Sequence, residues 1–316
     1  MEAFVERYNA WIDDLLNDPA ERRRHPTAKR LRDLDAHQKT IYERILKTSQ
    51  ARAQIGYCEA TITLQDGIEF YRFPGNFRRF LRFERRADTD VNASRISGVS
   101  GMGNPNNVME TMGTVAPWEY GRGVILMTQQ RGFRVKPVPT LTEDQVWTLC
   151  YQKGPIHPHY ATFESDAENV GPSFLRIPAS VSADQGTVVR WPDYYVGEVL
   201  RILDASAGAG QFIEVSAYNP KNGQCTLRHD FRPTPSGTIK YEFGSFLPEG
   251  LDKIVAVSVA LANTAVADRT EQRSLLTKEW KELYAACSHY FNSATADRPH
   301  SANPTYMDAT VDPMAI

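Results

Sequence analysis

The spacing of hydrophobic residues changes twice along the chain, from helical to strand-like and back to helical. Over residues 2–16 apolar side chains recur every three or four positions, which predicts an amphipathic helix that ends at 17–19. The same spacing predicts a second helix over residues 27–48. Its inward-facing residues are Leu31, Leu34, Ile41 and Ile45.

From residue 55 the hydrophobic period falls to two, which is the period of a β-strand. The segment 55–64 alternates throughout, and Asp66-Gly67 is typical of a hairpin turn to a second strand over 68–73. A third strand is predicted over 77–86. In it Leu81 and Phe83 share one face, while Phe80 and Arg82 share a solvated, arginine-bearing face.

Short strands separated by turns continue to residue 246. They are predicted at 123–128, 133–138, 146–151 and 188–191, and then in a compact module over 199–246 in which Asn222-Gly223 marks a tight turn. Residues 87–115 and 164–174 show no sustained period and are predicted to be loops. Many short strands with frequent turns favour a barrel or a sandwich over a parallel sheet.

The C-terminal part returns to helical spacing. One helix carries Leu251, Ile254, Val255, Ser258, Val259 and Ala262 on one face, and a turn near 267–269 leads to a second with Leu276, Trp280, Leu283, Tyr284, Cys287 and Phe291. Together they predict an αα-hairpin. The residues after it include Pro299, Pro304 and Pro313 and few core-forming side chains, which predicts an extended tail.

These patterns predict an α+β protein. Its N-terminal helices occupy residues 1–53 and its C-terminal helical hairpin residues 248–292, and the two are expected to form one helical bundle. Between them, residues 54–247 form one or more β-rich domains, a large antiparallel insertion that resembles a barrel or a sandwich. An extended C-terminal tail covers residues 293–316.

Composition narrows the possible functions. A net charge of -2 over 316 residues gives no global electrostatic case for binding nucleic acid or a membrane. No apolar run approaches the roughly 20 residues that span a bilayer, and the first residues lack the pattern of a secretion signal. The four cysteines lie far apart, so we expect folding in a reducing, cytoplasmic environment.

Two short motifs resemble binding sites but lack the features that such sites require. The glycine-rich segment 206–211 is followed by a predicted strand and not by the helix that a phosphate-binding loop requires, so it predicts a turn in which Gly208 and Gly210 take positive φ angles. His157 and His159 have no visible third or fourth metal ligand nearby. The sequence therefore predicts no catalytic residues, no metal site and no cofactor.

Arginines gather in one part of the β-rich region. They are Arg78, Arg79, Arg82, Arg85 and Arg86. A solvated face or ion pairs between subunits is the favoured interpretation of this basic patch, ahead of contact with the DNA phosphate backbone. A second basic cluster at 22–25 is interpreted as a solvated helix face, with an acidic partner or a phosphate backbone as the alternative.

Three elements of this layout together resemble the head-to-tail adaptor (connector or neck) proteins of tailed bacteriophages. The first is the module from Leu200-Arg-Ile-Leu through Gly-Ala-Gly-Gln and Val-Ser-Ala-Tyr to Phe231-Arg-Pro-Thr-Pro-Ser-Gly-Thr and Tyr241. The second is Leu247-Pro248-Glu-Gly-Leu251 entering a helical hairpin that carries Trp280-Lys-Glu-Leu-Tyr284, and the third is the tail after Asp297-Arg298-Pro299. The resemblance is best over residues 190–300, and the large β-rich insertion departs from the small all-helical adaptors.

The resemblance implies a structural virion protein that is made in the host cytoplasm and is not an enzyme. Such adaptors typically form a homo-oligomeric, dodecameric ring below the portal protein, and their C-terminal tails reach into the portal. By analogy the portal-binding residues would be Arg298, Pro299, Pro304, Tyr306, Met307, Pro313 and Ile316. The basic patch would face the lumen or a subunit interface, and DNA would pass the lumen without sequence-specific contacts. Further expected partners are a downstream tail or nozzle protein and fibres, with no membrane.

Two alternatives remain open from the sequence. One is a tail or fibre-attachment protein that binds through the β-module. The other is a virion-associated glycan hydrolase that uses two carboxylates close in space but distant in sequence. Ring symmetry and portal binding distinguish the adaptor from the first alternative. Substitutions of candidate Glu and Asp residues that abolish hydrolysis without loss of assembly would favour the second.

Overall fold

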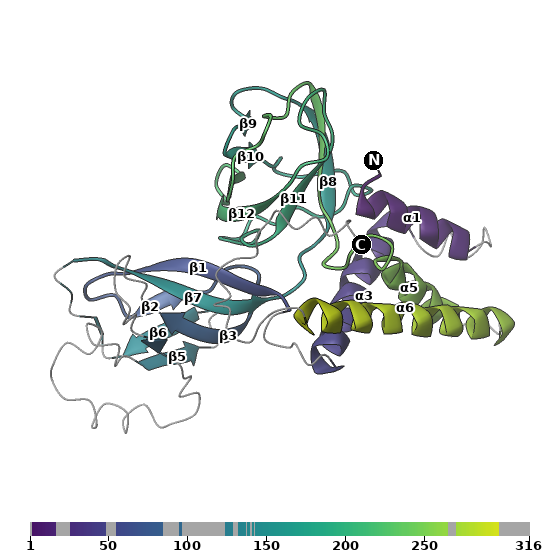
Figure 1. The fold of residues 1–316 in the computed structure, drawn as a ribbon, viewed down its shortest axis with the longest axis horizontal. Coiled ribbons are helices and arrows are strands. Elements are labelled where there is room, and N and C mark those ends of the chain that lie inside the picture. Colours follow the sequence, from purple (N-terminus) through teal and green to yellow (C-terminus); the bar gives the residue numbers. More distant parts are fainter. Residues whose placement is uncertain are drawn as a thin grey trace. The chain divides into compact units, whose positions relative to one another are not determined.

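The computed structural model describes residues 2–16, 26–48, 55–84, 95–96, 124–128, 132–136, 138–139, 141, 143–264 and 270–296 (Figure 1). The chain divides into two compact units. Unit 1 combines residues 1–55 with 155–316, and unit 2 consists of residues 56–154. Unit 2 is therefore an insertion in the sequence of unit 1, and the β-rich region of this α+β protein is split between the two units.

The described helices of unit 1 share one hydrophobic core. They are α1 (Phe4–Leu15), α3 (Thr27–Thr48), α5 (Lys253–Thr264) and α6 (Thr270–Ala296), and they confirm the helices predicted at both ends of the chain. The core includes Tyr8, Ile12, Leu34, Ile41, Ile45, Ile254, Val257 and Leu276. Every residue from Ile254 to Ala260 is buried, so α5 is covered on nearly all sides. The prediction of a single buried face that includes Ala262 is wrong, because Ala262 is exposed.

Unit 1 also contains a curled antiparallel sheet of seven strands (Figure 1). In spatial order the strands are β8 (His159–Glu164), β14 (Thr238–Phe243), β11 (Val199–Asp204), β12 (Phe212–Asn219), β13 (Gln224–Leu227), β10 (Phe174–Arg176) and β9 (Val170–Gly171). Leu200, Ile202, Val215, Ile239 and Tyr241 are buried along it. The four strands β11, β12, β13 and β14 confirm the predicted 199–246 module, and Gly223 in its tight turn has a φ of 73°.

The sequence missed the strands β4, β8, β9 and β10 and misplaced one. Strand β4 (Arg95–Ile96) lies inside the predicted loop 87–115. Residues 188–191 were predicted as a strand, but the structure places them outside any strand. The segment 164–174, predicted as a loop, contains β9 and the first residue of β10. β9 and β10 are only two and three residues long, which is too short to show a hydrophobic period.

Unit 2 contains two antiparallel sheets among its described residues. One has the order β1 (Tyr57–Leu64), β7 (Gln145–Lys153), β3 (Phe77–Glu84) and β4 (Arg95–Ile96). The other has the order β2 (Phe70–Arg72), β6 (Gly132–Lys136) and β5 (Val124–Thr128). The turn at Asp66-Gly67 is present, but the predicted hairpin is wrong, because β1 pairs with β7 and β2 pairs with β6.

Two β-bulges in β3 set which of its side chains face the core of unit 2. They lie between Phe77 and Arg79 and between Phe80 and Arg82. Each bulge adds one residue and changes the phase of the alternation, so every third residue returns to the same face. The register places Phe77, Phe80 and Phe83 opposite Lys153, Tyr151 and Leu149. The prediction that Phe80 shares a solvated face with Arg82 is therefore wrong, and Phe80 is only 8% exposed.

Aromatic rings fill the core of unit 2. Phe83 from β3 stacks on Trp147 from β7 with ring centroids 4.9 Å apart, and it meets Phe133 from β6 edge-on at 5.6 Å. Phe77 stacks on Phe73 at 3.7 Å. Because Phe133 belongs to the three-stranded sheet and Trp147 to the four-stranded sheet, these rings join the two sheets.

Candidate functional site

Most of the predicted interaction residues lie outside the described part of the chain. This holds for all the expected portal-binding residues, namely Arg298, Pro299, Pro304, Tyr306, Met307, Pro313 and Ile316. It also holds for Arg85 and Arg86 of the basic patch and for the cluster at 22–25. The portal and lumen assignments of these residues therefore stay predictions.

The remaining arginines of the basic patch lie on β3. Arg79 is exposed and lies opposite Gln152 in the register, and Arg82 lies opposite Cys150. Arg78 is half-buried at the first bulge. Gln152 and Cys150 alternate with the core-facing residues of β7, so the paired position of Arg79 is on the face of the sheet away from the aromatic core.

The glycine-rich segment 206–211 is a rigid turn, as predicted. Gly208 and Gly210 have φ angles of 78° and 80°, and the strand β12 follows them directly. The Gln211 amide donates hydrogen bonds to the carbonyls of Gly208 at 3.0 Å and Pro233 at 2.8 Å. These bonds fix the turn against the segment that leads to β14.

The two histidines at 157 and 159 do not converge. The Nδ1 atom of His157 contacts the Asp35 carboxylate of α3, whereas His159 is fully buried among aromatic rings. Within the described residues, no group of three or more His, Cys, Asp or Glu side chains is placed to hold a metal ion.

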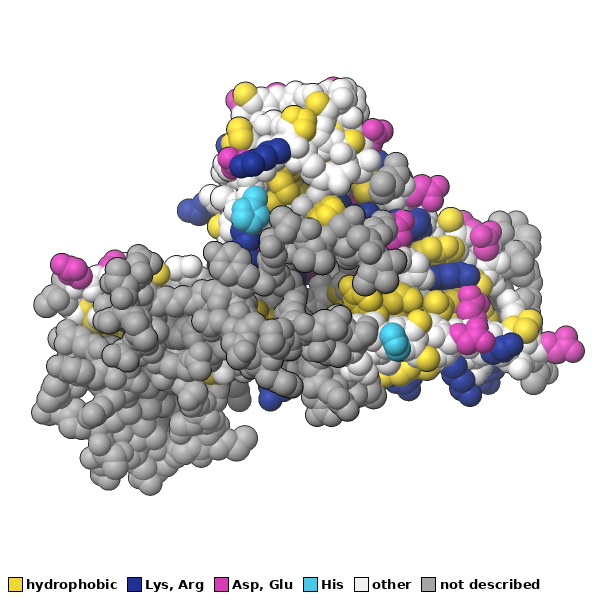
Figure 2. All heavy atoms as spheres, viewed as in Figure 1, with side chains coloured by type: hydrophobic (Ala, Val, Ile, Leu, Met, Phe, Trp, Pro, Cys, Tyr) yellow, Lys and Arg dark blue, Asp and Glu magenta, His cyan; other side chains and the backbone are white. Residues whose placement is uncertain are grey.

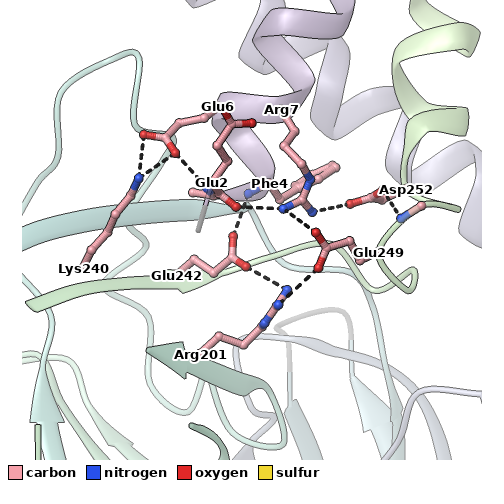
Figure 3. A network of polar contacts seen from close by, with 11 residues as sticks. Glu2, Phe4, Glu6, Arg7, Arg201, Lys240, Glu242, Glu249 and Asp252 are labelled. Carbon is pink, nitrogen blue, oxygen red and sulfur yellow. Dashed lines mark hydrogen bonds and ion pairs between the residues drawn. The ribbon is translucent and has the colours of Figure 1, made fainter. Parts of the chain in front are cut away.

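The most organised polar site is one that sequence reasoning missed. It is a charged network, here called the α1 joint, that attaches the first turns of α1 to the seven-stranded sheet and to the start of α5 (Figure 3). Its charged members are Glu6, Arg7, Arg201, Lys240, Glu242, Glu249 and Asp252. All of them belong to unit 1.

Glu242 of β14 caps the N-terminus of α1. Its Oε2 accepts a hydrogen bond of 2.7 Å from the backbone N–H of Phe4, and its side chain is 1% exposed. The first N–H groups of a helix have no partner within the helix, and the helix dipole favours a negative charge there. The guanidinium of Arg201 lies 3.0 Å from the other carboxylate oxygen of Glu242.

Arg7 links α1 to the residues that lead into α5. Its guanidinium donates a 2.7 Å hydrogen bond to Asp252, whose side chain is 2% exposed, and lies 3.4 Å from Glu249. Glu249 also lies 3.4 Å from Arg201, so this carboxylate bridges two arginines (Figure 3). The arrangement joins a helix, a strand and a loop that are distant in sequence.

A second ion pair and an apolar contact complete the α1 joint. Lys240 of β14 donates to both carboxylate oxygens of Glu6, at 2.9 and 2.7 Å. Buried around this contact are Ala3, Val5, Tyr160 and Leu203. The Lys240 and Glu6 side chains themselves are 22% and 31% exposed, so this ion pair is partly screened by water.

Burial acts upward on the pKa of each of these carboxyls, but the net shifts differ in direction. Desolvation raises the pKa of Glu242 and of Asp252, and the neighbouring arginines only partly oppose it. For Glu6 desolvation also acts upward, but the hydrogen bonds from Lys240 and from the Ala3 N–H outweigh it and leave the pKa lowered. Burying the charged carboxylates of Glu242 and Asp252 therefore costs free energy.

Replacing Glu242 with glutamine tests this balance, because glutamine still accepts the Phe4 hydrogen bond but cannot ionise. The folded-state pKa of Glu242 lies above its ordinary value of 4.5. A raised carboxyl pKa means that stability is lost as pH rises through the folded pKa. We therefore expect the melting temperature of E242Q minus that of wild type to increase as pH rises from about 4.5 through the folded-state pKa of Glu242, and to stay constant above it.

Thermal denaturation followed by circular dichroism measures this difference. The matched control is Glu214→Gln, which removes a half-exposed partner of Arg228 on β12 of the same sheet. It is expected to give a small difference without that trend. A melting-temperature difference for E242Q that stays constant with pH would contradict the interpretation.

No family model, no curated protein and no solved structure matches this chain. Among the helices that the structure describes, none is both long enough and apolar enough to cross a membrane. The function is therefore argued from the geometry of the chain itself.

Proposed function

We propose that this chain is a structural virion protein, a head-to-tail adaptor that forms a ring between portal and tail and lets DNA pass. The observation that carries the proposal is the apolar surface left on the helices of unit 1. Partly buried side chains on the outside of the helical core include Trp11, Leu15, Leu261, Trp280, Leu283 and Tyr284, and Leu275 is 70% exposed. Figure 2 shows hydrophobic side chains gathered over these helices, with charged side chains around them.

In this proposal the four helices act as a bundle that packs against neighbouring copies. Apolar side chains gathered on a protein surface are typical of a protein–protein interface. A closed ring repeats one heterologous interface until it closes, and a dodecamer is the expected ring size. Many modest contacts then add to a stable joint.

The α1 joint supports the same role mechanically. An adaptor must keep its helices and its sheet in a fixed relation while neighbouring components attach to them. The Phe4 N–H bond to the buried Glu242 carboxylate and the Lys240–Glu6 ion pair attach α1 to β14, and so attach the helices of unit 1 to its sheet. Residues 298–316 follow α6 in sequence and dock on the portal in this proposal, and the basic patch faces the lumen or a subunit interface.

Two variants of the full chain test the proposal by mass photometry, alone and mixed with the portal protein. Wild type is expected to give a ring-sized complex with the portal, and deletion of 298–316 is expected to abolish it. Leu275→Glu places a charge in the apolar surface and should reduce assembly at least tenfold, which corresponds to about 1.4 kcal/mol. The matched control Ser274→Glu adds the same charge at the adjacent exposed position and should assemble normally.

A stable monomer that ignores the portal would overturn the proposal. The tail or fibre-attachment alternative would then be tested by binding to tail components, and the glycan-hydrolase alternative by hydrolysis assays. Equal loss of assembly in both charge variants would show that the apolar surface is not the interface.

A further inference from the structure

The chain returns from unit 2 to unit 1 through a segment that is firmly attached. This segment, Pro155–Tyr160, is here called the re-entry anchor. On one side α3 holds it, because the Gln38 amide donates a buried 2.9 Å hydrogen bond to the Ile156 carbonyl and Asp35 contacts His157. The backbone N–H of His157 also donates a 2.9 Å hydrogen bond to the hydroxyl oxygen of Tyr194.

The loop at 185–187 holds the re-entry anchor from another side. The Tyr160 N–H donates to the Gln185 carbonyl at 2.9 Å, and the Thr187 N–H donates to the Pro158 carbonyl at 3.3 Å. Gly186 between them has a φ of 111°, and a Cβ there would lie 2.2 Å from the Pro158 oxygen. Only glycine fits this approach, so the loop and the anchor are in close backbone contact.

His159 at the end of the anchor is buried without a polar partner. Its exposed fraction is 0%, and among the residues that the structure describes neither ring nitrogen has a hydrogen-bond partner. The rings of Tyr195, Phe243 and Tyr241 surround it at centroid distances of 5.5, 5.3 and 6.0 Å. An imidazolium has two N–H donors, and the backbone of His157 can accept from at most one of them while the surrounding rings accept from neither.

The titratable and charged groups that face His159 do not favour a positive charge. They are Tyr195 and Tyr241 from the cage, Arg190 from the loop that precedes β11, and His157 from the anchor itself. None of these groups is a carboxylate. Burial lowers the pKa of His159 to about 3 and outweighs a hydrogen bond to the backbone of His157 that acts upward, and the charges of Arg190 and His157 act in the same direction as burial.

We propose that the re-entry anchor is an acid-released catch, in which neutral His159 keeps the anchor closed and protonation of His159 opens it. The closed state excludes the proton because the ring is dry and lacks acceptors for both of its N–H groups. An open state exposes the ring to water, where its ordinary pKa of 6.5 applies. Between pH 6.5 and about 3 the open state is therefore favoured by about tenfold more for each pH unit of acidification.

Hydrogen–deuterium exchange of the full-length chain tests the catch. Protection of peptides within 155–164, corrected for intrinsic exchange, is measured between pH 7 and 5 and compared with β11 peptides from the same sheet. In wild type we expect anchor protection to fall by about tenfold per pH unit below pH 6.5, and β11 protection to fall less. His159→Phe fills the aromatic cage without a titrating group and should remove the steep pH dependence.

Gln38→Ala is the matched control, because it loosens the same anchor without touching a titrating group. It should lower protection of the anchor by a similar factor at every pH. His159→Leu replaces His159→Phe if the larger ring prevents folding. The proposal is overturned if the anchor and β11 lose protection in parallel, or if the variants without His159 keep the wild-type pH dependence. It does not depend on the adaptor role.

Discussion

Replacing Arg7 with methionine is expected to lower the free energy of unfolding of unit 1 by about 3–5 kcal/mol, the cost of leaving a buried charge without its partner. Arg7 is 13% exposed and its partner Asp252 is 2% exposed, so water cannot replace the lost hydrogen bonds. Methionine keeps an apolar stem and a good helix propensity, so the packing of α1 is disturbed little. Urea denaturation followed by circular dichroism measures the change.

Two further variants separate the lost charge partner from other effects. The double variant Arg7→Met with Asp252→Asn should recover more than half of the loss, because the asparagine still accepts the Gly250 N–H bond and carries no charge. Arg228→Met breaks a pair with Glu214 that is 46% and 30% exposed, and should cost less than about 1 kcal/mol. Equal costs for Arg7→Met and Arg228→Met would contradict the buried character of the α1 joint.

The helices and the 199–246 module are predictable from sequence because their signals are local. The spacing of Tyr8 and Ile12 is enough to place them on one face of α1. The residue pair Asn222-Gly223 is enough to predict a tight turn. The short strands β9 and β10 offer no such signal. β10 exists because β13 provides a partner for it, and β9 exists because β10 does so in turn, which is a tertiary effect.

The α1 joint and the bulges of β3 depend on pairings that spacing does not reveal. Glu242 caps a helix that begins 238 residues earlier, and nothing near either residue indicates the contact. The only local hint is that Lys240 and Glu242 alternate with apolar residues in β14, which is also the pattern of a solvated face. In β3 the recurrence of phenylalanine at 77, 80 and 83 was a usable signal, since two bulges convert a spacing of three into one face.

The second prediction with a large expected effect concerns the core of unit 2. Phe83→Ala should lower the free energy of unfolding of this unit by about 3–5 kcal/mol, as for other large aromatic truncations in a packed core. Phe83 is 0% exposed and contacts rings of both sheets, so its loss leaves a cavity where they meet. Hydrogen exchange in β7 under increasing urea, in the full chain, reports the stability of unit 2.

Two neighbouring positions make this result specific to the bulged register. Leu81 is the extra residue at the second bulge and is only half-buried, so Leu81→Ala should cost about 1 kcal/mol. Val146→Ala, next to Trp147 and 58% exposed, should change stability by less than about 0.5 kcal/mol. In a strand without bulges Leu81 and Phe83 would share the core face, and their truncations would then cost similar amounts. A large cost at Phe83 with a small cost at Leu81 therefore supports the bulged strand, and similar costs would contradict it.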